Sequence, residues 1–335
     1  MMSNHIPQRI VFLRKQEVDI ESFELPTLQS DEVKIRCQYS LMSTGTENIV
    51  FNCLYDKGTH WDNWVKFPFY PGYAAAGIIE EAGSDVTHLK VGDRVGYRAG
   101  HSSHAVVKET ACYPIPEEIP SEQAVWFALA KISFQGAMAA KYNLGDRVLI
   151  IGAGPIGQMS LRWARASGAK KVFVVDPVSE RAHIAQAGGA SVYFPTPANE
   201  AKAGILEAND NTLPNVVIDS TGHPAVFSVA LDLAARSGRV ILMGDTGQPA
   251  SQTLTSDVIM KGLSITGAWD GHKFPDWDEA AITSLFFTMV KDGRFNLDGL
   301  NTHEFTPDQC VEAYTTANRD RAQTMGILFN WNLKP

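Results

Sequence analysis

A phenol, an ammonium and a carboxylate that could exchange protons with a substrate occur in three short stretches of this chain. The sequence TGTE spans residues 44–47, YPGY spans 70–73, and Lys131 interrupts the apolar run FALAKISF. A phenol has a pKa of about 10, and a nearby ammonium would lower it enough for Tyr73 to act as a general base. A lysine within an apolar run is rarely buried without a reason. These residue types could exchange protons with a substrate if the fold brings them together.

A glycine-rich turn provides the strongest signal for a bound cofactor. GAGPIG (152–157) follows the apolar run RVLII (147–151) and opens a segment with helical apolar spacing. In this context the first glycine permits a tight turn, the second lets a pyrophosphate approach the backbone, and the third lets the helix lie against the strand. The helix N-terminus offers free N–H groups and a positive dipole end to the phosphates. The motif predicts cofactor binding by Gly152, Gly154, Pro155, Ile156 and Gly157.

Later residues favour NAD as that cofactor. Asp176 ends the next predicted strand, nineteen residues after Gly157. A carboxylate there accepts hydrogen bonds from both ribose hydroxyls of NAD and repels the additional phosphate of NADP. Arg181 could hold that phosphate, although a solvated or adenine-stacking role is the favoured alternative. Thr221 and Gly244 follow later strands at their carboxyl ends, where the nicotinamide half should lie. A Rossmann-like domain that binds no nucleotide is the remaining alternative.

These residues must be positioned by two kinds of structure. Residues 1–120 contain short alternating runs separated by Gly, Asp and Pro, which predict strands at 33–37, 77–81, 94–97 and 105–107. From 124 to 270, helical segments alternate with strands predicted at 147–151, 172–175, 191–194, 215–219, 239–243 and 264–266. This alternation predicts a parallel sheet with helices on both faces, and hence an α/β fold. A helix at 278–291 and a strand at 325–329 are also expected.

Composition excludes several classes of protein. The chain has 335 residues, enough for two domains, and a net charge of −8, which argues against broad binding to nucleic acids or anionic membranes. The N-terminal MMSNHIPQR lacks the apolar core of a signal peptide. No apolar run approaches the roughly 18 residues of a membrane span. The four cysteines form no CxxC, so neither a disulfide framework nor a cysteine-rich zinc lobe is expected. We expect a cytoplasmic protein with a small-molecule partner.

The order of motifs resembles that of a known superfamily. VGDRV, PIPEEIPSEQA, LGDRVLIIGAGPIG, VIDSTG and GRVILMG follow one another as in the medium-chain dehydrogenase/reductase superfamily of the zinc alcohol dehydrogenase type. The resemblance covers nearly the whole chain. It implies a GroES-like catalytic domain (1–123 and 270–335), a Rossmann NAD-binding domain (124–269) and an active site between them. It also implies a homodimer through the edge strands of the Rossmann sheets, near 264–266.

The zinc ligands of that superfamily are replaced in this chain. Thr44 stands in place of the first cysteine, Tyr73 and Ala74 replace a histidine and a glutamate, and the third ligand position falls at Phe127 or Ala128. Zinc prefers thiolate, imidazole or carboxylate ligands, so no metal is expected there. STGTE followed by YPGY is also similar to a zinc-lacking branch that includes the bacteriochlorophyllide hydroxyethyl dehydrogenases.

Without zinc, a side chain must accept the proton of the substrate hydroxyl. Tyr73 assisted by Lys131 is the first candidate; the alternatives are that Tyr73 fills the vacated metal site and that Lys131 snorkels to solvent. Thr46 matches the family's proton-relay hydroxyl, and Glu47 is expected chiefly as the structural partner of an arginine. His101, in HSSH (101–104), aligns with a position that lines the substrate. A metal shared with the second histidine is disfavoured, because residues i and i+3 of a strand face opposite sides.

The predicted function is a zinc-independent, NAD-dependent dehydrogenase that acts on a secondary hydroxyl of a sugar, polyol or cyclitol-like molecule. Two polar-aromatic segments, 59–70 and 267–278, motivate this substrate class, because aromatic rings pack on sugar C–H groups. Surface loops held in place by aromatic residues are the alternative explanation. A quinone or enone reductase and a non-catalytic dinucleotide-binding protein are the competing functions.

Overall fold

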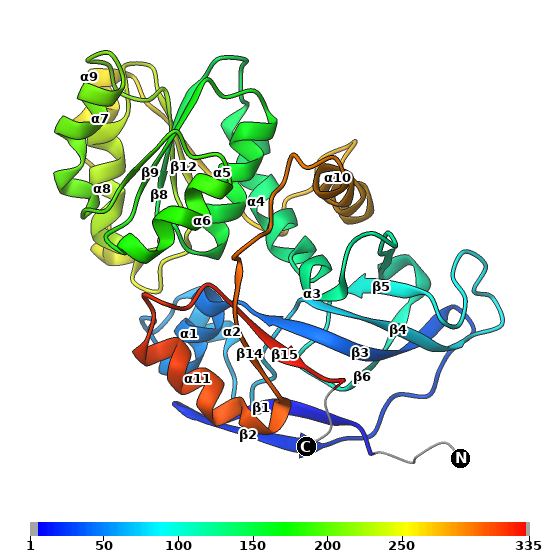
Figure 1. Ribbon diagram of the computed structural model, residues 1–335. Coiled ribbons are helices and arrows are strands. Elements are labelled where there is room, and N and C mark those ends of the chain that lie inside the picture. Colours follow the sequence, from blue (N-terminus) through cyan, green and yellow to red (C-terminus); the bar gives the residue numbers. More distant parts are fainter. Residues whose placement is uncertain (1–5, 333–335) are drawn as a thin grey trace.

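Two large sheets organise the chain, one in the lower and one in the upper half of Figure 1. The computed structural model describes residues 6–332. Residues 1–5 lie outside this range. The prediction that the N-terminal segment is not a signal peptide falls partly on these residues. None of the helices in the described range is long and apolar enough to cross a membrane.

The lower, seven-stranded sheet has the order β14-β15-β3-β4-β5-β7, with β6 paired to β3. Its pairs are antiparallel except for the parallel pair β14–β15. A separate hairpin, β1–β2, lies beside it. The strands are β1 (Gln8–Arg14), β2 (Glu17–Ser22), β3 (Glu32–Met42), β4 (Ala75–Ala82), β5 (Arg94–Tyr97), β6 (His104–Lys108), β7 (Cys112–Pro114), β14 (Asn301–Phe305) and β15 (Gly326–Asn330). The helices of this half are α1 (Thr44–Asn52), α2 (His60–Trp64), η1 (Glu109–Ala111), α3 (Ser121–Ala124), η5 (Pro307–Gln309) and α11 (Cys310–Arg319).

Alternation along β3 shows how sequence builds this sheet. Val33, Ile35 and Cys37 point into the core and are fully buried. Lys34 and Arg36, between them, point to the other face and form ion pairs with two glutamates of β4. A period of two therefore separates an apolar face from a charged face, as expected for a half-buried strand. The predicted strands of residues 33–107 are confirmed, each within a few residues of its bounds.

The upper sheet is parallel throughout and has the order β10-β9-β8-β11-β12-β13. Its strands are β8 (Arg147–Ile151), β9 (Lys171–Val175), β10 (Val192–Phe194), β11 (Val216–Asp219), β12 (Arg239–Leu242) and β13 (Ser264–Gly267). Its helices are α4 (Phe127–Ala140), α5 (Pro155–Ala166), η2 (Ser179–Arg181), α6 (Ala182–Ala187), η3 (Ala198–Glu200), α7 (Lys202–Ala208), α8 (Pro224–Leu233), η4 (Pro249–Ser251) and α9 (Asp257–Lys261).

Helices cover both faces of the parallel sheet. Val148 and Ile150 of β8 point toward apolar residues of α4, α5 and α6, whereas Leu149 and Ile151 point toward α7 and α8. Because both faces are buried, the strand is a continuous apolar run rather than an alternating one. The prediction of an α/β fold with this doubly covered parallel sheet is confirmed.

Two long helices lie where the sheets meet. Helix α4 packs against α5 and against α10 (Glu279–Lys291), which follows β13 and leads the chain back to the lower sheet. The indole N–H of Trp163 donates to the backbone carbonyl of Ala130 on α4, 2.8 Å away. Asp278 caps α10 by accepting the N–H of Ala281 at 2.7 Å. The predicted helix at 278–291 is confirmed.

Helices α1 and α2 were not expected in the β-rich half. The segment of α1, TGTENIVFN, is rich in β-branched residues, which locally favour strands. Its helix is stabilised instead by packing, since Val50 and Phe51 lie in a core with Phe12 and Tyr314. Tertiary contact outweighs a weak local preference here.

Candidate active site

The GAGPIG turn has the geometry of a phosphate cradle. Gly152 has a φ of 93°, and a Cβ on Gly157 would lie 1.9 Å from the carbonyl oxygen of Gly152, so both positions require glycine. A Cβ on Gly154 would meet no atom within 4 Å, which leaves open space at the N-terminus of α5. Pro155 is the first residue of that helix, where its missing N–H costs nothing. The turn therefore fits a dinucleotide pyrophosphate, with Ile156 next along the helix.

Asp176 is fixed at the end of β9 beside this turn. Its carboxylate accepts the backbone N–H groups of Ala153 at 2.7 Å and Val178 at 2.9 Å. Arg181, which we expected to be solvated or to stack on adenine, is instead an ion-pair partner, with its Nη1 3.2 Å from Asp176. Its Nη2 donates to the carbonyl oxygen of Arg321 at 2.7 Å. Arg181 thus links the residue expected to bind ribose to the segment that leads into β15.

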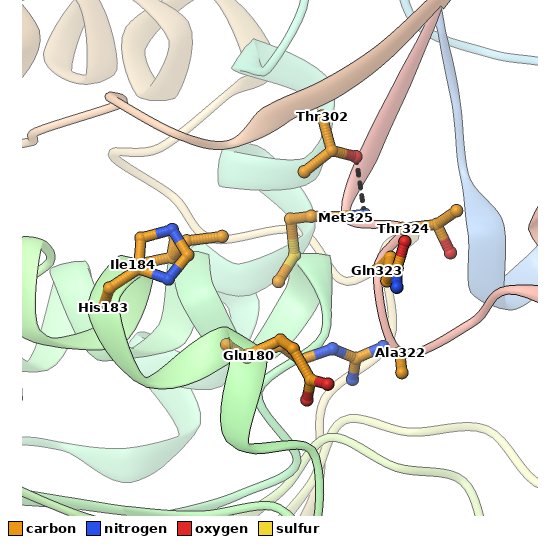
Figure 2. A pocket seen from close by; sticks show the side chains of 9 residues that line it. Glu180, His183, Ile184, Thr302, Ala322, Gln323, Thr324 and Met325 are labelled. Carbon is orange, nitrogen blue, oxygen red and sulfur yellow. Dashed lines mark hydrogen bonds between the residues drawn. The ribbon is translucent and has the colours of Figure 1, made fainter.

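A small cavity lies beside Arg181. Figure 2 shows its lining from helix α6 on one side and residues 322–325 on the other, with Met325 pointing into the space between them. The Thr302 hydroxyl accepts the N–H of Met325 at 2.9 Å and closes one wall. The volume is about 180 Å³, below the roughly 300–1,000 Å³ of ordinary ligand sites. We assign it no ligand of its own.

The turns after β11 and β12 approach each other closely. A Cβ on Gly244 would lie 2.0 Å from the backbone nitrogen of Gly222, so only glycine permits this approach. Thr221 donates its N–H at 2.9 Å and its hydroxyl at 2.7 Å to the Asp219 carboxylate. Burial raises the pKa of Asp219, and these hydrogen bonds oppose the rise. Thr221 and Gly244 therefore lie at neighbouring carboxyl ends of the parallel strands.

Tyr73 is paired with a serine that the sequence did not single out. Its hydroxyl lies 2.5 Å from the hydroxyl of Ser43. Ser43 is the N-cap of α1. A serine at this position ordinarily caps the helix with its hydroxyl, but the Ser43 hydroxyl makes no capping hydrogen bond. Burial raises the pKa of Tyr73; hydrogen bonds from Ser43 and Thr46 and the charge of Arg98 oppose the rise. Tyr73 consequently keeps its proton at neutral pH.

The cation beside Tyr73 is Arg98, so the expected Tyr73–Lys131 pair is wrong. The Arg98 guanidinium lies over the phenol ring, 5.5 Å from its centroid. The Lys131 ammonium instead contacts Asp270, at 2.7 Å from the carboxylate and 2.6 Å from the backbone carbonyl. Arg98 also binds Asp270 at 2.9 Å and Glu279 at 2.6 Å. Arg98 and Glu279 were not predicted as site residues, because nothing in the local sequence distinguishes them from surface charges.

Glu47 and His101 lie beneath this site and not in it. Glu47 accepts hydrogen bonds from the Tyr314 hydroxyl and, at 2.7 Å, from the Ser43 N–H. His101 Nε2 lies 3.1 Å from the same carboxylate, and its Nδ1 lies 2.8 Å from the hydroxyl of Ser40. The prediction that Glu47 pairs with an arginine is therefore wrong. The prediction that His101 contacts the substrate is also wrong, because its side chain is fully buried.

The residues present do not fit a zinc ion. Thr44 and Tyr73 offer only hydroxyls, and Phe127 is buried with its ring 5.5 Å from that of Tyr113. The two histidines of HSSH have different partners, since His104 Nε2 lies 3.6 Å from Glu80. Within residues 6–332, no group of three or more His, Cys, Asp or Glu could hold a metal. The four cysteines are unpaired with one another. These side chains offer zinc no suitable set of ligands.

The polar-aromatic segments are partly explained by packing. Trp61 is buried in the core beneath α1, and the Trp277 ring packs on Phe134 at 5.0 Å. His60 Nε2 lies 2.9 Å from a carboxylate oxygen of Asp245, beside Gly244. In contrast, Trp269 is 67% exposed. Most of these rings anchor the loops. The proposal of a sugar-like substrate therefore depends on the charged groups around Asp270 rather than on the rings.

Two family models match consecutive parts of this architecture. The alcohol dehydrogenase GroES-like domain matches residues 29–140, and the zinc-binding dehydrogenase domain matches residues 155–285. The chain belongs to the medium-chain, zinc-type alcohol dehydrogenase superfamily.

Curated relatives and solved structures agree with this membership. L-threonine 3-dehydrogenase of Bacillus velezensis is 23% identical over 85% of this chain and 88% of its own length. D-xylulose reductase of Scheffersomyces stipitis is 23% identical over 91% of this chain and 93% of its own. Galactitol-1-phosphate dehydrogenase of Escherichia coli has a TM-score of 0.80 at 21% identity, covering 96% of this chain and 99% of that one. The alcohol dehydrogenase rspB of E. coli CFT073, complexed with NADH, has a TM-score of 0.80 at 22% identity, covering 97% and 99%.

Proposed function

We propose that this chain is a zinc-independent, NAD-dependent dehydrogenase that interconverts a secondary hydroxyl and the matching ketone. The observation that carries the proposal is the contact between the hydroxyls of Tyr73 and Ser43, because Tyr73 is the residue expected to replace a zinc-binding histidine. The Ser43 hydroxyl makes this contact and no capping hydrogen bond to α1. An oxidoreductase acting on CH–OH groups agrees with the names of the curated relatives.

The side chains around Tyr73 suffice for the proton transfer of such a reaction. A dinucleotide held at the turn 152–157 and by Asp176 would supply hydride transfer to and from the substrate carbon. In the reducing direction, protonated Tyr73 donates its proton to the oxygen of the forming alcohol. Ser43 and Thr46 then hydrogen-bond to the phenolate, and the Arg98 charge stabilises it. In the oxidising direction the proton returns to Tyr73 by the same path.

NAD is the proposed cofactor because of Asp176. Its carboxylate is held by two backbone N–H groups and is positioned to accept the ribose hydroxyls. Arg181 is already paired with this carboxylate, which leaves it less free to neutralise the 2′-phosphate of NADP. The finer assignment to the zinc-lacking branch similar to the bacteriochlorophyllide hydroxyethyl dehydrogenases is part of the same proposal.

Sugars, polyols or cyclitol-like molecules are the proposed substrates. Several curated relatives are named for such reactions, including D-xylulose reductase and sorbitol dehydrogenase. Charged hydrogen-bonding groups near Tyr73 from Arg98 and Asp270 are consistent with a substrate that carries several hydroxyls. A homodimer is proposed through β13, an edge strand whose Ser264, Thr266 and Gly267 are exposed.

The test is an NAD⁺-reduction screen over sugars and polyols, run with and without a strong zinc chelator, alongside metal analysis of the purified protein. We expect turnover that survives the chelator and less than one zinc per ten chains. Chelator-sensitive turnover with one zinc per chain would overturn the proposed mechanism. Turnover only of enones with NADPH would replace the function by that of a quinone or enone reductase. Tight NADH binding with no turnover at all would indicate a non-catalytic protein.

A further inference from the structure

A carboxylate of the chain itself occupies a doubly cationic site beside Tyr73. The two oxygens of Asp270 accept from Arg98, Oδ2 from Nη1 at 2.9 Å and Oδ1 from Nη2 at 3.3 Å. Oδ1 also accepts from the Lys131 ammonium at 2.7 Å. A two-pronged contact with arginine and a further contact with lysine is how a protein binds a free carboxylate or phosphate.

Charges in this cluster are balanced. Arg98 and Lys131 contribute two positive charges, and Asp270 and Glu279 contribute two negative ones. The Lys131 side chain is only 10% exposed, so its charge is poorly screened by water. The Asp270 side chain is 33% exposed and is the most accessible of the four. An anionic ligand reaching these cations would have to displace this carboxylate.

We propose that Asp270 determines substrate specificity by acting as an internal anion. It neutralises the Arg98–Lys131 pair, so that the site accepts neutral hydroxylated substrates and rejects those with a carboxylate or phosphate near the reacting hydroxyl. The inference rests on the proposed function for the identity of the reaction, but the anion-binding property can be measured without turnover. Rejection by an unpaired or repelled charge is a recognised route to specificity.

Asp270→Asn is the direct test because it removes one charge and keeps the shape. The cluster then carries a net positive charge next to the phenol. Binding of malonate and of inorganic sulfate is measured by calorimetry on the wild type and the variant. A unit charge at about 5 Å in a partly buried site corresponds to at least a tenfold change in affinity. We expect the variant to bind both anions at least tenfold more tightly than the wild type.

Three controls make the test decisive. Asp276→Asn neutralises an exposed carboxylate of the same loop and should leave anion binding unchanged. Lys131→Met in the Asp270→Asn background should abolish the gain, because the ammonium would be lost. Glu279→Gln removes the other carboxylate of the cluster and should give a smaller gain, because Asp270 still covers both cations; this variant covers the case that Asp270→Asn folds poorly.

The proposal is overturned if Asp270→Asn and Glu279→Gln bind the anions no more tightly than the wild type. It is also overturned if the gain survives Lys131→Met, since the anion would then lie elsewhere. Where turnover is found, Asp270→Asn should raise kcat/KM for an acidic sugar at least tenfold relative to the neutral polyol. Gained anion binding in a protein without turnover would support the role of Asp270 while refuting the proposed reaction.

Discussion

The hydroxyl of Ser43 contacts the hydroxyl of Tyr73 at 2.5 Å and leaves the first turn of α1 without its usual side-chain cap. The backbone N–H of the same serine donates to Glu47 at 2.7 Å. Ser43 therefore contacts both Tyr73, the proposed acid–base group, and the buried carboxylate of Glu47. This arrangement is why we propose an acid–base role for the phenol rather than a packing role alone.

Tyr73→Phe is expected to lower kcat by about 10²–10⁴-fold, the usual contribution of a positioned acid or base. The ring and its packing are kept, so the affinity for NADH measured by fluorescence titration should be unchanged. Tyr142→Phe is the matched control, because the Tyr142 hydroxyl is buried and has no hydrogen-bond partner. A kcat within threefold of the wild type for Tyr73→Phe would leave the phenol with a packing role only.

The pH dependence should differ between the two directions of the reaction. Burial raises the pKa of Tyr73 above its ordinary value of 10.0, so the phenol is protonated through the neutral range. The rate of ketone reduction should therefore stay level from neutral pH to above pH 10, and the rate of alcohol oxidation should rise with pH over that interval. Profiles of kcat in both directions would show this. An oxidation profile that is unchanged in Tyr73→Phe would assign the titration to another group.

Asp176→Ser should change the choice of cofactor. The variant removes the charge that repels the 2′-phosphate and releases Arg181 from its ion pair. A change of about 2–3 kcal/mol would shift the preference for NADP over NAD by roughly a hundredfold. The ratio of kcat/KM for the two cofactors is the measurement, with the exposed Asp210→Ser as control. An unchanged ratio would mean that the ribose binds elsewhere.

Glu47→Ala should destabilise the protein. It leaves the buried donors of Tyr314 and Ser43, and the ring of His101, without their acceptor. Breaking a buried network of this kind costs about 3–5 kcal/mol in the free energy of unfolding, which urea denaturation measures. Glu81→Ala, which breaks an exposed pair with Lys34, should cost about 0–1 kcal/mol. Equal losses for the two variants would contradict the buried network.

Thr266→Lys should dissociate the proposed dimer. Thr266 is exposed on β13 at the edge of the parallel sheet, where an unpaired strand can join that of a second chain. A lysine there would face its own copy across a two-fold axis and repel it. Light scattering should report a mass near 73 kDa for the wild type, about twice the 36.7 kDa chain, and half of that for the variant. Ser84→Lys, on the other domain, should leave the mass unchanged, and a monomeric wild type would refute the dimer.

Much of the fold could be predicted because its signals are local. RVLII reads as a continuous apolar run from Val148 on, since β8 is buried on both faces. GAGPIG follows directly and forms the turn from β8 into α5. The expectation that the zinc ligands are replaced also rests on local signals, because a ligand's chemistry belongs to the residue type. Helix α1 was missed because the packing of Phe51 on Tyr314, 263 positions apart, overrides its strand-favouring composition.

By itself the sequence determined the elements and the cofactor turn, and it supplied the residue types on which the expectation of a zinc-free site rests. Only the tertiary structure decided which charges and hydroxyls are partners. Glu47 meets Tyr314 across 267 positions, and Lys131 meets Asp270 across 139. Periodicity and motif spacing are carried by neighbours along the chain, whereas a hydrogen bond requires two atoms to come within about 3 Å. Which distant residues satisfy that distance is fixed by the packing of the whole chain.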